Sequence, residues 1–112
     1  MKVKDVLDSK HFQLISDDSG IENEVNGMFS CDLLSQVMGF AKESNILITV
    51  LNNINVLGVA SLLDLSCVIF SHNTKVKQAV IDKANNLNIP LLRTKLPTSE
   101  TVIALYKIGV KD

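Results

Sequence analysis

The stretch from Cys67 to Thr94 constrains the fold of this chain more than any other segment. It begins with four apolar residues, continues with a helical pattern at 74–87 and ends with a second apolar run at 89–92. Short apolar runs bounded by turn residues are typical of buried strands, and apolar residues at every third or fourth position are typical of a helix. A strand–helix–strand unit places its two strands parallel and leaves the loops after them free to hold a ligand. These loops are Ser71–Asn73 and Thr94–Lys95.

Three further segments are predicted to join the sheet. Ile46–Leu51 is a nearly unbroken apolar run, as expected of an interior parallel strand that neighbours the one beginning at Cys67. His11–Ile15 alternates as a half-buried strand does, and Glu24–Phe29 reads as a weaker strand with Gly27 as a bulge. We expect this weaker strand to pair antiparallel with another N-terminal segment. The predicted fold is a three-layer α/β/α domain with a mainly parallel sheet built on βαβ units.

Capping residues mark the expected helix starts. Ser30 is placed to cap a helix with its apolar face at 33–41, and Asp32 lies in the first turn, where the helix dipole favours a negative charge. Asp32 is therefore expected to be structural. Asn55 is expected to cap a short helix at 56–64.

Length and composition indicate one ordinary globular domain, spanning residues 1–112. The chain has 112 residues, of which 46% are hydrophobic, enough for a single core. Cys31 and Cys67 lie in apolar segments without a Cys-x-x-Cys pattern, which favours buried thiols over a metal site. Met1–Asp5 lacks the apolar core of a signal peptide, and no apolar run approaches the roughly 20 residues of a membrane span. We therefore expect a cytoplasmic protein with no metal, no cofactor and no membrane contact.

Charge is uneven along the chain, although the net charge is −1. Residues 1–70 hold four Lys/Arg and nine Asp/Glu, whereas residues 71–112 hold seven and three. This asymmetry fits an electropositive patch near the loops of the second half, head-to-tail contact between subunits, or simply two solvated faces. No basic run is interleaved with aromatic residues, so nucleic acid is not an expected partner.

The short helix predicted at 56–64 has almost no polar face. Val56 to Leu63 is apolar at nearly every position, whereas a surface helix of a small monomer normally carries a polar side. Two explanations remain open: a second copy of the chain covers the helix, or the helix is tucked between the sheet and its neighbours. The first explanation predicts a homodimer.

Several of these segments together resemble a DRTGG domain. They are Gly27 with Cys31–Ser35, Ile46–Thr49, the strand Val68–Phe70 with its loop and helix, and Ile89–Leu92 with Thr94–Thr98. The resemblance covers roughly residues 27–109. DRTGG domains occur as small stand-alone proteins, some associated with iron hydrogenase systems, and beside CBS domains in regulated pyrophosphatases; a similar domain forms the N-terminal part of HPr kinase/phosphorylase. The resemblance implies an α/β domain that tends to dimerise and, in some members, lies close to an adenine-nucleotide effector. It does not imply an enzyme.

The name-giving residues of that family are replaced in this chain. Ser71-His72-Asn73 stands where Thr-Gly-Gly would follow the central strand, and Asn52–Asn55 contains no Asp-Arg pair. A glycine pair lets backbone amides approach an anion closely. The sequence also has no Gly-x-x-x-x-Gly-Lys-Ser/Thr loop of a kinase, and His72 has no evident nucleophile or Asp partner. We therefore expect no catalytic residues and no enzyme activity.

Polar residues after the predicted strands are the candidate ligand-binding residues: Asn52, Asn53, Ser71, His72, Asn73, Thr94, Lys95, Thr98 and Ser99. Caps and turns alone would also account for most of them. One function they support is a regulatory or ligand-sensing module, in which a nucleotide or other small anion lies against the helix N-termini after Asn73 and Pro97, with Lys95 or Arg93 supplying charge. The alternative is an assembly subunit that dimerises and docks on a metabolic or redox enzyme without a small ligand. An anion site would require six of the polar residues after the last two strands to converge in one cleft: Ser71, His72, Asn73, Lys95, Thr98 and Ser99.

Overall fold

The computed structural model describes residues 1–111, and in this part of the chain five strands form one sheet in the order β1-β5-β4-β3-β2. The strands are β1 (Gln13–Leu14), β2 (Met28–Ser30), β3 (Ile46–Thr49), β4 (Cys67–Phe70) and β5 (Leu91–Arg93). The helices are α1 (Val3–Asp8), α2 (Leu34–Phe40), α3 (Asn55–Leu62), α4 (Gln78–Leu87) and α5 (Thr98–Lys107). Strands β2 to β5 are parallel to their neighbours, and β1 is antiparallel to β5. The predicted mainly parallel α/β fold is confirmed.

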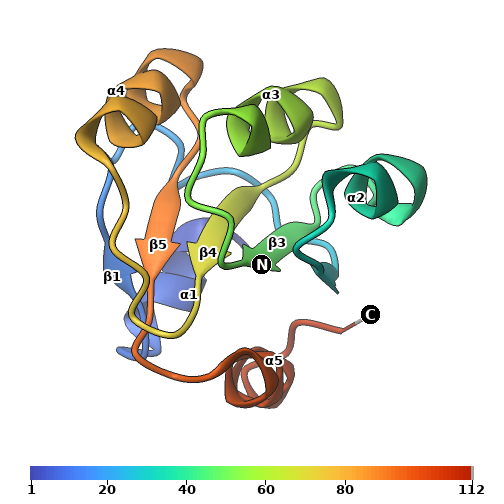
Figure 1. The fold of residues 1–112 in the computed structure, drawn as a ribbon. Coiled ribbons are helices and arrows are strands. Elements are labelled where there is room, and N and C mark those ends of the chain that lie inside the picture. The colour runs from blue at the N-terminus through green and yellow to red at the C-terminus, as the bar shows by residue number, and fades with distance from the viewer. Residues whose placement is uncertain (112) are drawn as a thin grey trace.

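Helices cover both faces of the sheet. Figure 1 shows α4, α3 and α2 in a row over one face and α5 beneath the other, where α1 also packs. Leu47 and Phe70 belong to the core under α2, α3 and α4, whereas Ile48 and Ile69 belong to the core that α1 and α5 cover. Because alternate side chains of one strand enter opposite cores, the interior strands are apolar at nearly every position.

The N-terminal pairing differs from the prediction. The strand within segment 24–29 pairs parallel with β3, so the expected antiparallel partner is wrong for β2. Helix α2 carries the chain back to the start of the next strand, and such a crossover requires parallel strands. Only Glu24 forms an antiparallel bridge with an N-terminal residue, Lys2. The antiparallel strand of the sheet is β1, in which Gln13 pairs with Arg93 of β5.

The predicted cap of α2 is also wrong. Ser30 is the last residue of β2, and Asp32 precedes the helix rather than lying in its first turn. Asp32 is nevertheless structural, because its Oδ1 accepts hydrogen bonds from the Thr49 hydroxyl at 2.8 Å and the Val50 backbone N–H at 2.9 Å. This carboxylate ties the segment before α2 to the end of β3.

Helices α3 and α4 begin at other residues than predicted. Asn55 is the first residue of α3 rather than its cap, and its backbone N–H donates to Oδ1 of Asn53 at 2.7 Å. Helix α4 begins at Gln78, four residues after the start of the predicted range 74–87. The residues between β4 and α4 instead form a longer loop at the edge of the sheet.

Helix α3 is buried on one side and open on the other. Val56, Leu57 and Ala60 are at most 1% exposed and pack against the sheet, so the explanation of a tucked helix is right for this side. Ile54, just before the helix, is 49% exposed, and Leu62 is 69% exposed. The outward side of α3 therefore carries exposed Leu62 and half-buried Val59 beside exposed Gly58 and Ser61.

The two cysteines have different surroundings. Cys67 is fully buried in β4, and burial raises the pKa of its thiol to about 12. Cys31 is only half-buried, so the prediction of two buried thiols is wrong for this residue. Both thiols are free.

Candidate functional site

The loops that follow β4 and β5 form the carboxyl edge of two neighbouring parallel strands. Backbone hydrogen bonds join the two loops: His72 N–H donates to the Leu96 carbonyl at 2.9 Å, and Asn73 N–H donates to the Thr94 carbonyl at 2.8 Å. The βαβ unit predicted from the sequence therefore brings these loops together. Carboxyl edges of this kind are common ligand sites in α/β sheets.

Three of the candidate residues meet at the start of α5. Nε2 of His72 accepts a hydrogen bond from the Thr98 backbone N–H at 3.2 Å, and the hydroxyls of Ser71 and Thr98 lie 2.7 Å apart. Ser71 is fully buried. Because the first N–H groups of a helix have no partner within the helix, His72 acts as a side-chain cap. Ser99 is exposed in the first turn of the same helix.

The β4–α4 loop has an unusual backbone. His72 and Asn73 have φ angles of 58° and 52°, two consecutive left-handed residues. Glycine adopts this conformation readily, whereas most other residues pay about 1 to 2 kcal/mol for it. The loop thus has the left-handed backbone that glycines favour, at the position where the DRTGG pattern has its glycine pair.

The two asparagines after β3 tie helices in place. Asn52 donates through Nδ2 to the Lys75 carbonyl, and its Oδ1 accepts from the Lys77 backbone N–H at 3.1 Å. It therefore holds the approach to α4, while Asn53 satisfies the first turn of α3. Neither residue lines the cleft described next.

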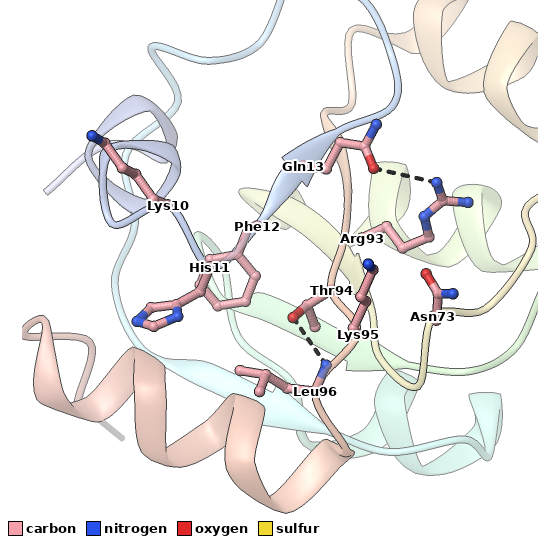
Figure 2. Close-up of a pocket in the computed structure, with 9 residues that line it drawn as sticks. All are labelled: Lys10, His11, Phe12, Gln13, Asn73, Arg93, Thr94, Lys95 and Leu96. Atoms are coloured by element: carbon pink, nitrogen blue, oxygen red, sulfur yellow. Dashed lines mark hydrogen bonds between the residues drawn. The ribbon is translucent and has the colours of Figure 1, made fainter.

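A cleft of about 430 Å³ lies beside β5, between the edge loops and the segment that leads into β1. It is lined by Lys10, His11, Phe12, Gln13, Asn73, Arg93, Thr94, Lys95 and Leu96 (Figure 2). Asn73, Thr94 and Lys95 are the candidate residues that the structure brings into it. The six residues that we expected to converge are divided: Asn73 and Lys95 line the cleft, whereas Ser71, His72, Thr98 and Ser99 do not.

Positive charge dominates this cleft. Three cationic side chains line the cleft: Lys10, Arg93 and Lys95. No carboxylate among residues 1–111 lines it. Arg93 donates from Nη2 to Oε1 of Gln13 at 3.2 Å, which positions the guanidinium. Figure 2 shows Arg93, Lys95 and Asn73 on one side of the cleft and Lys10 on the other, across Phe12, with the Lys10 ammonium turned away from Arg93 and Lys95. Such a surface can bind an anion but offers no nucleophile with a paired base.

Buried Thr94 shapes the start of the loop between β5 and α5. It is 4% exposed, and its Oγ1 accepts a hydrogen bond from the Leu96 backbone N–H at 3.2 Å (Figure 2). The chain therefore turns tightly after β5, with Lys95 exposed at the turn.

Sequence reasoning missed the residues that the N-terminal segment contributes. Lys10, His11, Phe12 and Gln13 enter the cleft because β1 pairs with β5. The alternation at 11–15 predicted a strand but could not specify its neighbour. Placing these side chains would have required the knowledge that segment 11–15 forms an edge strand beside β5.

The structure gives no sign of a metal centre in the part of the chain that it describes. No group of three or more His, Cys, Asp or Glu side chains within residues 1–111 is placed to hold a metal ion. No helix formed by these residues is long and apolar enough to cross a membrane.

Comparisons with known proteins agree with this architecture. Residues 59–108 match the family described as HPr Serine kinase N terminus. The match runs from within α3 through β4, α4 and β5 to the end of α5, and so includes the loops after β4 and β5. This part of the chain is therefore similar to the N-terminal domain of HPr kinase. No curated protein matches the sequence.

A solved structure extends the likeness to nearly the whole chain. It contains the CBS and DRTGG domains of the regulatory region of Clostridium perfringens pyrophosphatase, in complex with the activator diadenosine tetraphosphate. The two chains share 14% identity with a TM-score of 0.73, over 97% of this chain and 46% of that structure. The chain thus has a DRTGG-type fold, as the resemblance predicted, and spans less than half the length of that regulatory region.

Proposed function

We propose that this chain is a non-catalytic regulatory module, a single domain spanning residues 1–112, that binds a small phosphate-bearing anion in the cleft beside β1 and β5. The observation that carries the proposal is the charge of the cleft, with Arg93, Lys95 and Lys10 and no carboxylate among the described lining residues. Arginine and lysine side chains with amide donors are the groups that bind phosphate in proteins.

The relatives support a regulatory role. The matched pyrophosphatase structure is a regulatory region bound to an activator that carries four phosphates. We infer from the shared fold that this chain also senses a phosphorylated compound. The ligand lies at the carboxyl edge of the sheet, and the conformation of the β4–α4 and β5–α5 loops responds to its binding.

A thermal-shift and calorimetric screen of pyrophosphate and adenine nucleotides tests the proposal. A ligand at 100 times its dissociation constant should stabilise the fold by about 2.7 kcal/mol and raise Tm by several degrees. Lys95→Glu should abolish the shift and leave the fold intact, because Lys95 is exposed. Lys42→Glu makes the same charge change on an exposed residue outside the cleft and should keep the shift. A screen without any shift, or equal binding by Lys95→Glu, would refute the cleft as the site.

A second observation favours assembly. The outer side of α2 and α3 carries exposed apolar residues: Leu33, Met38, Phe40, Ile54 and Leu62. Four of its apolar residues, Met38, Ile54, Val59 and Leu62, line a shallow hollow of about 540 Å³. Contiguous apolar patches of this kind are typical of protein interfaces. We propose that a second copy of the chain covers this face in a homodimer. In this second function, the dimer would dock on a partner enzyme.

Light scattering coupled to size exclusion tests the dimer. The wild-type chain should show twice its mass of 12.3 kDa, and Leu62→Glu should reduce the mass to that of a monomer. Leu57→Glu is unsuitable because Leu57 is fully buried, so this charge would prevent folding. Ile103→Glu, on exposed α5, is the matched control and should leave the dimer intact. A wild-type mass near 12.3 kDa would rule out this assembly.

A further inference from the structure

A second hollow adjoins the cationic cleft. Its volume is about 260 Å³, and it is lined by His11, Leu96, Glu100, Ile103, Ala104, Lys107 and Ile108. His11 and Leu96 also line the first cleft, so the two hollows meet at these residues. Figure 2 shows the His11 imidazole on the side toward α5, apart from Arg93 and Lys95.

The two hollows differ in chemistry. The first presents cations and amides, whereas the second is lined mainly by apolar residues at the C-terminal half of α5, here called the apolar floor: Ile103, which is 53% exposed, Ala104 and Ile108. Its lining also includes one exposed carboxylate, Glu100, and one exposed amine, Lys107, here together called the rim. The combined site therefore has a cationic end and an apolar end with polar groups at its border.

We propose that the two hollows form one binding site for a nucleoside phosphate. This inference rests on the proposed function and specifies its ligand class. The phosphates lie against Arg93 and Lys95, and the nucleobase lies on the apolar floor formed by α5, with His11 between them. An inorganic anion would occupy only the first hollow and leave the second unused.

The rim selects a nucleobase over other apolar groups. Glu100 can accept a hydrogen bond from an exocyclic amino group, and Lys107 can donate to a ring nitrogen or carbonyl. An acyl chain would offer neither partner. A planar ring with polar edges satisfies the apolar floor and the rim together.

Calorimetry with AMP and ribose 5-phosphate tests the inference, because these two ligands differ only in the base. We expect AMP to bind about tenfold tighter, a difference of about 1.4 kcal/mol. Ile103→Ser should bring AMP to the affinity of ribose 5-phosphate by removing the apolar floor. Tyr106→Ser is the control: Tyr106 is 54% exposed on the same helix but lines neither hollow, so the tenfold difference should remain.

The outcomes separate this inference from the proposed function. If pyrophosphate binds and depends on Lys95, but AMP and ribose 5-phosphate bind equally, the cationic cleft stands and the nucleobase site is overturned. An AMP preference that survives Ile103→Ser also overturns it. If pyrophosphate, AMP and ribose 5-phosphate all fail to bind, the proposed function itself falls.

Discussion

Two left-handed residues, His72 and Asn73, determine the shape of the loop between β4 and α4. Asparagine tolerates this conformation better than most residues, and His72 gains a hydrogen bond by capping α5. The loop thereby keeps a fixed backbone without glycine. This arrangement places the Asn73 side chain in the cationic cleft, where a glycine would contribute no side chain.

The backbone at Asn73 makes a direct prediction about stability. Asn73→Ala should lower the free energy of unfolding by about 1 to 2 kcal/mol, because alanine at positive φ is strained. Asn73→Gly should be tolerated, since glycine adopts this conformation without strain. Urea denaturation of the wild type and the two variants measures the order of their unfolding free energies. An alanine variant as stable as the glycine variant would contradict the left-handed backbone.

Burial makes the two thiols unequal in reactivity. The pKa of Cys67 is raised to about 12 by burial, so this thiol stays protonated and inaccessible at pH 8. Cys31 is half-buried and should react with an alkylating reagent in the native protein. Mass spectrometry should find one modified cysteine before unfolding and two after it. Modification of Cys67 in the native protein at the rate of Cys31 would contradict the core of β4.

At the scale of elements, long-range contacts position the segments that local patterns describe poorly. The turn after β1 packs Gly20 against the junction of α4 and β5, and a Cβ on Gly20 would lie 2.6 Å from the Asn88 carbonyl oxygen and 2.7 Å from Pro90 Cδ. This contact fixes the N-terminal segment beside β5 and so holds one wall of the cleft.

Replacing this glycine should loosen the wall. Gly20→Ala should cost about 1 to 3 kcal/mol of stability, because backbone atoms must move to admit the methyl group. Gly39→Ala on α2 is the control, since a Cβ there meets no atom within 4 Å, and it should stabilise the helix by up to about 1 kcal/mol. Equal melting temperatures for the two variants would show that the turn does not pack as described.

The sequence predicted interior elements well and their ends poorly. Runs such as Ile46–Thr49 are apolar because they are buried on both faces, so β3, β4 and β5 could be read directly. The start of α2 was misplaced because the partners of Asp32 are distant in sequence. Asp32 bonds to the end of β3 rather than to its own helix.

The candidate site, too, could be predicted only in part from the sequence. Asn73, Thr94 and Lys95 follow parallel strands, so their place at the sheet edge could be predicted from the βαβ unit alone. Lys10 and Gln13 could not, because their position depends on the order of strands, which local periodicity does not encode. The half of the cleft that comes from the N-terminal segment therefore appeared only in the structure.

At the scale of the whole molecule, the cationic cleft and the apolar face lie at opposite ends of the sheet. The cleft borders β1 and β5, whereas Figure 1 shows α2 and α3 toward the end formed by β3 and β2. A dimer formed through α2 and α3 would therefore leave the cleft open. The proposed homodimer and the proposed ligand site are therefore structurally compatible in one protein.

This separation predicts that assembly and binding are independent. A monomeric Leu62→Glu variant should bind pyrophosphate with the affinity of the wild type, because Leu62 lies outside the cleft. Isothermal titration of both proteins under the same conditions gives the comparison. Loss of binding in the folded monomer would place part of the ligand site at the subunit interface.

Backbone amide NMR of the ¹⁵N-labelled protein, titrated with pyrophosphate, tests the anion site most directly. We expect saturable shifts centred on residues 10–13, Asn73 and residues 93–96, which line the cleft, and little change on the exposed face of α2 and α3. The same titration of Lys95→Glu should leave these amides unmoved. Shifts centred away from the cleft, or identical shifts in Lys95→Glu, would contradict an anion site at the carboxyl edge of β5.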